Sequence, residues 1–404
     1  MQSNRFIQSI RLSGFLSFGS AFQTVELQPL NVLIGPNASG KSNFLELFRV
    51  LKAIPDNIAN PIHEGGGIAE YLCKGSSAQA TLNIEATIDW KEENSALQYL
   101  LEISNDQSWL KIIAESIKPV AANHINNFPI SFYTSTNRGR GKLARKTENL
   151  FNYDETESQQ YMYTDDDVSP NSSRSILSQY KDPKSYPSLA YLQGLFTNIQ
   201  FYSGWDSGRF GSLRHPQKAD IPSGSLLEDG SNLGLVLINK PSNIKQQITE
   251  KLRLVLPTIE EIFPKIEGGS VPLYIREKGF STPTPASRLS EGTLRYLCLL
   301  TLLLDPTPPP IICLEEPEAG LHPHVVSQIA ELLIDASQRT QLIVTTHSDS
   351  LISGLSECPE AIITCERDDE GTKLRRLDPE QIKPWLDRYA LGDLWRMGEI
   401  GGVR

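Results

Sequence analysis

The sequence predicts an α/β fold with a parallel core sheet interrupted by a large insertion, and three apolar runs predict it. Residues 30–34 lead directly into a glycine-rich turn, which is followed by a stretch with helical patterning. Residues 311–314 and 341–345 are short and continuous apolar runs, as strands buried in a parallel sheet are. Polar residues follow each run at once, at the carboxyl end where open α/β sheets bind their ligands.

The composition limits the class of protein. A chain of 404 residues fits two lobes, or one large lobe that carries an insertion. We expect a cytoplasmic protein with no membrane partner, because no run of 18 apolar residues is present and the first residues lack the pattern of a secretory signal. The five cysteines are scattered, so neither a disulfide nor a zinc site is expected. A net charge of -10 confines any DNA contact to a local basic groove.

A complete phosphate-binding loop follows the first apolar run. Its backbone N–H groups and the positive end of the next helix would point into one concavity, which suits a polyphosphate. Lys41 is expected to neutralise the β- and γ-phosphates, and the Ser42 hydroxyl to ligate Mg²⁺. The helix then buries one face, because its apolar residues recur at helical spacing. The predicted binding residues are Gly35, Pro36, Asn37, Ala38, Ser39, Gly40, Lys41, Ser42 and Asn43.

An insertion is expected next, because roughly 250 residues separate the loop from the following motif, far more than one helix and a few strands need. Residues 80–89 alternate as a half-buried antiparallel strand does, and residues 271–276 return to the sheet. Residues 135–187 are polar and predict a mobile or partly ordered excursion. Its basic run could contact DNA phosphates. Alternatively, it could be a solvated loop whose positive charges compensate the acidic stretch beside it, and this second interpretation is favoured. The basic residues are Arg138, Arg140, Lys142, Arg145 and Lys146.

The next motif is a Ser-Glu-Gly segment in front of an apolar helix at residues 294–304. Ser290 and Gly292 offer a hydroxyl and unobstructed N–H groups to an anion. Taken alone, such a segment is most often an ordinary helix cap. Its meaning therefore depends on the other motifs.

Two carboxylates and a histidine follow the later apolar runs. Glu315 and Glu316 come directly after residues 311–314, and strand alternation is expected to send them to opposite sides. One can hold hydrated Mg²⁺, and the other can orient or deprotonate an attacking water. A solvated acidic turn is the alternative, disfavoured by the buried strand in front of it. His347 lies after residues 341–345, where it can donate to a γ-phosphate.

In chain order, these motifs resemble those of ABC-type ATPases, in the soluble branch that includes RecF, SMC and OLD-like proteins of bacterial DNA repair and anti-phage defence. The resemblance rests on Gly-x-x-x-x-Gly-Lys-Ser, Leu-Ser-Glu-Gly, Glu-Glu-Pro-Glu, Gly-Leu-His-Pro and Thr-Thr-His-Ser. It implies an ABC-type P-loop ATPase head, with a mixed parallel core sheet and an antiparallel β-subdomain. The head would comprise residues 1–90 and 271–404, around an inserted, mostly helical and loop lobe at 91–270.

The resemblance also implies roles for these residues, with ATP and Mg²⁺ bound. Heads of this kind form head-to-tail dimers, in which the signature of one subunit closes over ATP held by the other, so we expect a homodimer or a higher homo-oligomer. The implied roles are catalysis for Lys41, Glu316 and His347, metal binding for Ser42 and Glu315, and signature contacts for Ser290 and Gly292.

Some features depart from the family pattern. Glu315 stands where many relatives carry Asp, no Q-loop glutamine is evident, and neither SMC-like arms nor a TOPRIM nuclease is expected. We expect an ATP-hydrolysing sensor or motor subunit of a DNA repair or anti-phage defence system. The alternative is an ATP-gated scaffold that hydrolyses slowly and holds or releases a separate effector, such as a nuclease. The aromatic residues near 385–395 either dock on the chain's own core or anchor such a partner.

Overall fold

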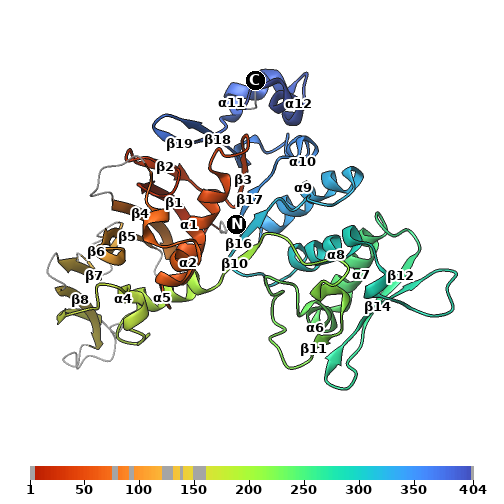
Figure 1. Ribbon diagram of the computed structural model, residues 1–404, viewed down its shortest axis with the longest axis horizontal. Helices are drawn as coiled ribbons and strands as arrows, with labels where there is room; N and C mark the ends of the chain where they lie inside the picture. The colour runs from red at the N-terminus through yellow and green to blue at the C-terminus, as the bar shows by residue number, and fades with distance from the viewer. Residues whose placement is uncertain are drawn as a thin grey trace, which may run out of the picture.

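The computed structural model contains a core sheet, an antiparallel sheet beside it and a separate lobe of helices and short strands (Figure 1). None of the helices in the described part of the chain combines the length and apolar character needed to cross a bilayer. The described residues are 5–74, 81–90, 95–120, 131–136, 140–148 and 161–401.

The core sheet has six strands in the order β10-β16-β17-β3-β18-β19. The first five are parallel, and β19 pairs antiparallel with β18. The three apolar runs of the sequence are the adjacent strands β3, β17 and β16, so the predicted parallel core is confirmed. The strands are β3 (Leu30–Ile34), β10 (Ile199–Tyr202), β16 (Ile311–Glu315), β17 (Gln341–Thr345), β18 (Ile362–Asp368) and β19 (Gly371–Arg376).

An antiparallel sheet of eight strands lies beside the core sheet, in the order β2-β1-β4-β5-β6-β7-β8-β9. The strand predicted at 80–89 is its third member, β4, whose residues alternate between buried and half-buried. The strands are β1 (Ile7–Ser13), β2 (Gln23–Glu26), β4 (Thr81–Trp90), β5 (Ser95–Asp106), β6 (Trp109–Pro119), β7 (Tyr133–Thr136), β8 (Arg140–Glu148) and β9 (Tyr161–Val168).

Alternating side chains of the core strands enter two hydrophobic clusters. Leu33 and Cys313 pack with α1 and the antiparallel sheet on one face. Val32 and Leu314 pack with α8 and α9 on the other. The helices are α1 (Lys41–Ala53), α2 (Ala59–Glu64), α3 (Ile68–Tyr71), α4 (Ile176–Gln179), α5 (Pro187–Thr197), α6 (Leu233–Asn239), α7 (Ser242–Leu252), α8 (Glu291–Leu303), α9 (Pro323–Ser337), α10 (Asp349–Ser353), α11 (Pro379–Leu386) and α12 (Leu391–Met397).

A separate lobe, at the lower right of Figure 1, contains α6, α7, α8 and short strands. The return predicted at 271–276 lies here, in β13 and β14, and pairs within this lobe. The elements are β11 (Gln217–Lys218), β12 (Ile259–Pro264), β13 (Ser270–Val271), β14 (Leu273–Glu277) and β15 (Thr284–Pro285), with 3₁₀ turns at Ser212–Arg214 and Ala286–Arg288 and, outside the lobe, at Pro359–Ala361.

The interval 91–270 differs from the single, mostly helical lobe expected from the sequence. Its first part supplies β5 to β9 of the antiparallel sheet, β10 is an edge strand of the core sheet, and only the remainder belongs to the separate lobe. The physical reason is strand periodicity in β5, where Leu97, Tyr99, Leu101 and Ile103 are fully buried on one face.

Part of the polar segment 135–187 forms the paired strands β8 and β9, which the sequence analysis did not predict. Lys142 lies opposite Asp167 in the ladder, and Arg145 approaches Asp166 at 3.6 Å. Opposite charges on neighbouring strands attract, so the charged composition is compatible with a paired hairpin. Arg138, Asp154, Glu155 and Glu157 lie outside the described residues.

Candidate functional site

Three of the groups singled out by the sequence meet at the carboxyl edge of the core sheet. The glycine-rich loop follows β3, the two carboxylates lie at the end of β16, and His347 follows β17. These three strands are neighbours and parallel, so their carboxyl ends lie side by side. Ligands of open α/β sheets bind at this edge.

The backbone of the loop requires its glycines. A Cβ atom on Gly35 would lie 2.4 Å from the carbonyl oxygen of Cys365, and one on Gly40 would lie 2.3 Å from Thr372 Oγ1. Gly40 has φ 106° and caps α1, and Ala38 has φ 64°. The loop is therefore a tight turn whose close approach to β18 and β19 leaves no room for a side chain at Gly35 or Gly40.

Lys41 is buried at the start of α1, with 6% of its surface exposed. Its ammonium donates to the carbonyl oxygens of Gly35 at 2.8 Å and Pro36 at 3.0 Å. Burial lowers the pKa of Lys41, while the nearby Cys365, Glu316 and Glu315 act to raise it. The loop thus encloses one cation, which its own carbonyl oxygens satisfy.

Ser42 and Glu315 are in direct contact although 273 positions separate them along the chain. The Ser42 hydroxyl, in the first turn of α1, donates to Glu315 Oε1 at 2.7 Å. A hydroxyl and a carboxylate are the hard oxygen ligands that Mg²⁺ prefers, with waters and substrate phosphates as the rest of its shell. The pair therefore fits a magnesium ion next to the phosphate loop.

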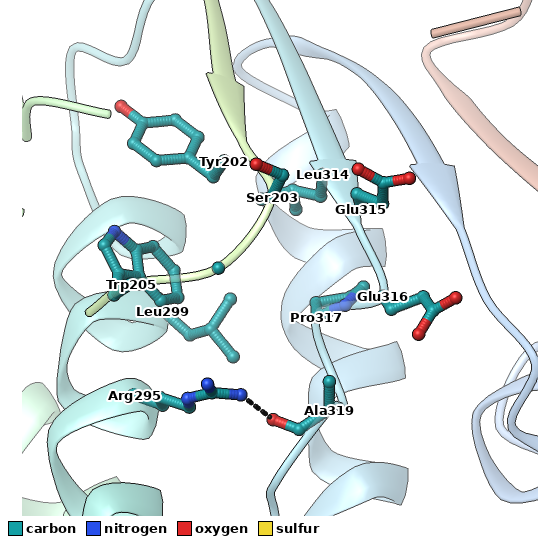
Figure 2. Close-up of a pocket in the computed structure, with 11 residues that line it drawn as sticks. Tyr202, Ser203, Trp205, Arg295, Leu299, Leu314, Glu315, Glu316, Pro317 and Ala319 are labelled. Atoms are coloured by element: carbon teal, nitrogen blue, oxygen red, sulfur yellow. Dashed lines mark hydrogen bonds between the residues drawn. The ribbon is translucent and has the colours of Figure 1, made fainter. Parts of the chain in front are cut away.

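Glu316 has an unusual backbone conformation, with φ 45°. The strand β16 ends at Glu315, so Glu316 lies outside the strand. The two carboxylates are therefore directed apart by a left-handed turn, and not by the strand alternation that the sequence predicted. Glu316 Oε1 lies 3.6 Å from His347 Nε2. Figure 2 shows both carboxylates pointing away from Trp205 and Arg295. Burial, together with the charge of Lys41, lowers the pKa of His347.

Glu318 holds the segment that carries His347, a role that the sequence analysis missed. Its carboxylate accepts hydrogen bonds from the Thr346 hydroxyl and from the His347 N–H, the latter at 3.2 Å. Burial raises the pKa of Glu318. The motif Glu-Glu-Pro-Glu contained this residue, but only the fold shows that the last glutamate reaches the end of β17.

The other residues predicted to bind nucleotide are distributed around the loop. Asn37 and Ala38 are exposed at its tip, and Ser39 is buried. Asn43 directs its side-chain amide to Ser17 Oγ at 2.7 Å.

Ser290 and Gly292 lie at the start of α8, in the separate lobe. Ser290 is exposed and its hydroxyl accepts from the Thr293 N–H at 3.1 Å, as a helix cap does. Figure 1 places α8 apart from α1. Within the described part of the chain, no hydrogen bond or ion pair joins Ser290 or Gly292 to the phosphate loop. One subunit therefore does not bring these residues to its own loop.

A cavity of about 270 Å³ lies between the core sheet and α8. Arg295 spans it, because its guanidinium donates to the Ala319 carbonyl at 2.9 Å (Figure 2). The same guanidinium donates to Ser207 Oγ at 3.0 Å. This arginine links α8 to the turn after Glu316. The cavity is lined by Tyr202, Ser203, Gly204, Trp205, Arg295, Leu299, Leu314, Glu315, Glu316, Pro317 and Ala319.

Comparison with known families and curated proteins gives three similarities. Residues 30–353 match the family described as "AAA domain, putative AbiEii toxin, Type IV TA system". The Old nuclease of Escherichia phage P2 is 28% identical over 182 residues, which are 42% of this chain and 29% of that protein. The branched-chain amino acid transport ATP-binding protein LivG of Escherichia coli K12 is 30% identical over 112 residues, 27% of this chain and 41% of LivG. The matches thus span less than half the length of these two relatives.

Two solved structures share the fold. A structure of the Smc head bound to the C-terminal winged-helix domain of ScpA has a TM-score of 0.55 and 14% identity, and the match covers 94% of this chain and 99% of that one. A Smc head from Pyrococcus furiosus, with an extended coiled coil and the C-terminal domain of ScpA, also has a TM-score of 0.55, at 12% identity, with 95% and 98% covered. At such identities the likeness shows the ABC-type head fold alone.

Proposed function

Because the chain belongs to the AAA-domain family that its residues 30–353 match, we propose that it binds ATP with Mg²⁺ and hydrolyses it as a head-to-tail dimer of ABC-type heads. The 2.7 Å contact between Ser42 and Glu315 is the observation that carries this proposal. It joins the first turn of the P-loop helix to the end of the neighbouring acidic strand. If the glycine-rich segment were only a surface turn and the acidic segment only a solvated turn, this contact between them would not be expected.

In the proposed function, the nucleotide phosphates lie on the loop from Gly35 to Ser42. Lys41 would exchange its two carbonyl partners for phosphate oxygens, which are stronger acceptors because they are charged. Mg²⁺, held by Ser42 and Glu315, would supply charge neutralisation at the β- and γ-phosphates. The lowered pKa of Lys41 reflects burial, which a bound polyanion would offset.

Glu316 is the proposed general base. Its carboxylate would accept a proton from the water that attacks the γ-phosphate, and water activation of this kind contributes about 10²- to 10⁴-fold in rate. His347, whose lowered pKa keeps it neutral at pH 7, would donate a ring N–H to the γ-phosphate without adding a second cation beside Lys41. The approach of Glu316 to His347 supports a shared water or phosphate position.

The exposed start of α8 supports a composite site. Ser290 and Gly292 do not contact the loop of their own chain, and an exposed helix N-terminus can bind an anion from another subunit. We propose that two copies bury ATP between the loop of one and the Ser290–Gly292 segment of the other. Nucleotide binding would then hold two heads together, and hydrolysis would release them.

The biological role that we propose is that of a sensor or motor subunit in a DNA repair or anti-phage defence system. The similarity to a phage nuclease and to SMC heads supports this role. The Smc heads in the two similar structures hold domains of ScpA, and we propose that this chain likewise binds a separate effector protein. Direct DNA binding is a further part of the proposal, tested by adding DNA ends to the ATPase assay.

A complementation assay tests the composite site. Lys41→Ala should remove the phosphate contacts, and Ser290→Asp should keep the helix cap while placing a negative charge against the γ-phosphate. Each variant alone should be inactive. In an equimolar mixture, half of randomly formed dimers are mixed and each has one intact site, so about a quarter of wild-type activity should return.

These assays distinguish the composite ATPase from the ATP-gated scaffold. No recovery of activity in mixtures that still form dimers would reject the composite site. If the wild-type chain binds ATP but shows no turnover with any nucleic acid, the scaffold that stores or releases an effector becomes the better description.

A further inference from the structure

A buried chain of hydroxyl groups connects the phosphate loop to the hairpin formed by β18 and β19. Thr372, with 1% of its surface exposed, places Oγ1 at 2.9 Å from the Ser39 carbonyl oxygen and at 2.7 Å from Ser17 Oγ. Ser17 Oγ in turn accepts from Asn43 Nδ2 at 2.7 Å. The four residues belong to three segments of the chain, because Ser39 and Asn43 both lie in the 35–43 segment. None of these contacts was evident from the sequence motifs.

The chemistry of the groups fixes the direction of this chain. A hydroxyl has one proton to donate, and a backbone carbonyl can only accept. The Thr372 proton therefore goes to the Ser39 carbonyl, and the Ser17 hydroxyl donates to Thr372 Oγ1. The Asn43 amide then donates to Ser17, so every group is satisfied in one arrangement only. Buried hydrogen bonds of this kind are costly to leave unmade.

Backbone contacts hold Thr372 in place independently of the loop. Its N–H donates to the Ser17 carbonyl at 2.8 Å. The preceding Gly371 has φ 120°, and a Cβ atom there would lie 2.6 Å from the same carbonyl. On the other side, Gly40 of the loop has no room for a Cβ, because Thr372 Oγ1 would be 2.3 Å away. Thr372 is thus a fixed point against which the loop packs.

We propose that Thr372 is a positioning residue for nucleotide binding, which fixes the orientation of the peptide between Ser39 and Gly40. In a trans peptide the C=O and N–H groups point in opposite directions. Anchoring the Ser39 carbonyl on Thr372 therefore directs the Gly40 N–H away from the hairpin, toward the concavity of the loop. This inference rests on the proposed function, because it assigns that N–H to a phosphate oxygen.

Three single substitutions in the full chain test the proposal. Thr372→Val keeps the shape of the side chain but leaves the Ser39 carbonyl and the Ser17 hydroxyl without their partner. Thr372→Ser retains the hydroxyl. The matched control is Thr340→Val, because Thr340 is also fully buried and donates to a backbone carbonyl, that of Pro309 at 2.6 Å, at the opposite edge of the core sheet.

The readouts are the Kd for MgADP by calorimetry, the KM and kcat for ATP, and the thermal midpoint. We expect Thr372→Val to raise Kd and KM about tenfold, as loss of one oriented phosphate hydrogen bond does, with kcat little changed. Thr372→Ser should restore wild-type binding. Thr340→Val should lower the thermal midpoint to a similar extent and leave Kd unchanged.

Several results would overturn the proposal. It is wrong if Thr372→Val binds MgADP as the wild type does, or if Thr340→Val weakens binding equally, since the effect would then be one of general stability. If Thr372→Val does not fold, Ser17→Ala takes its place with an expected two- to threefold rise in Kd, and an unchanged Kd rejects the idea. Failure of the wild-type chain to bind MgADP would instead reject the proposed function itself.

Discussion

The left-handed conformation of Glu316 predicts that stability and catalysis oppose each other at this residue. A non-glycine residue at φ 45° costs roughly 1–2 kcal/mol. The Glu316 side chain offsets little of this free-energy cost, because its contact with His347 is a half-exposed pair at 3.6 Å, and such pairs contribute about 0–1 kcal/mol. Strain of this kind persists at functional sites when the surrounding structure holds it there.

The perturbation is Glu316→Gly, compared with Glu316→Gln. Glycine relieves the strain but gains conformational freedom in the unfolded chain, worth about 0.5–1 kcal/mol, so the net gain should be about 0.5–1 kcal/mol. For a chain of this size we expect the thermal midpoint to rise by about 1 °C. Glutamine keeps the strain and should leave the midpoint unchanged. Both variants should lose about 10²- to 10⁴-fold in kcat, because neither can accept the proton.

Differential scanning fluorimetry and a steady-state ATPase assay measure the two effects. The matched control is Gln107→Gly, at the exposed tip of the β5–β6 hairpin, where Gln107 has φ 51°. It should raise the midpoint similarly and leave the ATPase rate unchanged. A midpoint for Glu316→Gly at or below that of the wild type, with Gln107→Gly stabilised, would refute the strain argument. Turnover by Glu316→Gln at the wild-type rate would refute the role as base.

Two further predictions concern stability. Burial, and then the charge of Lys41, lowers the pKa of His347, so the folded state takes up a proton less readily than the unfolded chain. The contribution of His347 to the free energy of unfolding should be fully present above pH 6.5 and be lost as the pH falls through the lowered pKa. Thermal midpoints between pH 5 and 8 should show this loss in the wild type and not in His347→Gln. Lys240 and Asp305 form an ion pair at 2.5 Å, with 6% and 4% of their side chains exposed. Lys240→Met should lower the free energy of unfolding in urea by about 3–5 kcal/mol, because it leaves the Asp305 charge buried and unpaired, and the double variant Lys240→Met/Asp305→Leu should lower it much less. Equal losses in the two variants would show that burial of an unpaired charge is not the cause.

The sequence predicted the elements whose signals are local. The strand at 30–34, the helix after the phosphate loop and the strand at 341–345 have strong periodicity or a continuous apolar run, and the structure forms them at those positions. The proximity of Glu315 to the loop also followed from local signals, because parallel strands align their carboxyl ends. The sequence therefore predicted these segments and the edge of the core sheet at which their strands end.

Other features depended on partners that are distant in the chain. The strand β10 has only four residues, Ile199–Tyr202, and its place beside β16 is set by packing. The pairing of β8 with β9 inside the charged segment 135–187 was not predicted, since the sequence does not show that a basic strand lies opposite an acidic one. Thr372 and Ser17 carry no motif at all. Their hydroxyls acquire a role only where the β18–β19 turn meets the loop.

The hydrogen bonds of Lys41 set a condition on any ligand that binds to the loop. The ammonium donates to the carbonyl oxygens of Gly35 and Pro36, so the buried charge has hydrogen-bond partners within the loop. A polyphosphate must break those two bonds, and only an acceptor stronger than a neutral carbonyl makes the exchange favourable. Phosphate oxygens meet that condition, whereas a neutral ligand does not. The same loop is held on its outer side by Thr372, which contacts the Ser39 carbonyl and is hydrogen-bonded to Ser17 through its side chain and its backbone N–H. Selectivity for an anion would thus arise from the side chain of Lys41, and affinity from a backbone that is already oriented before the anion arrives.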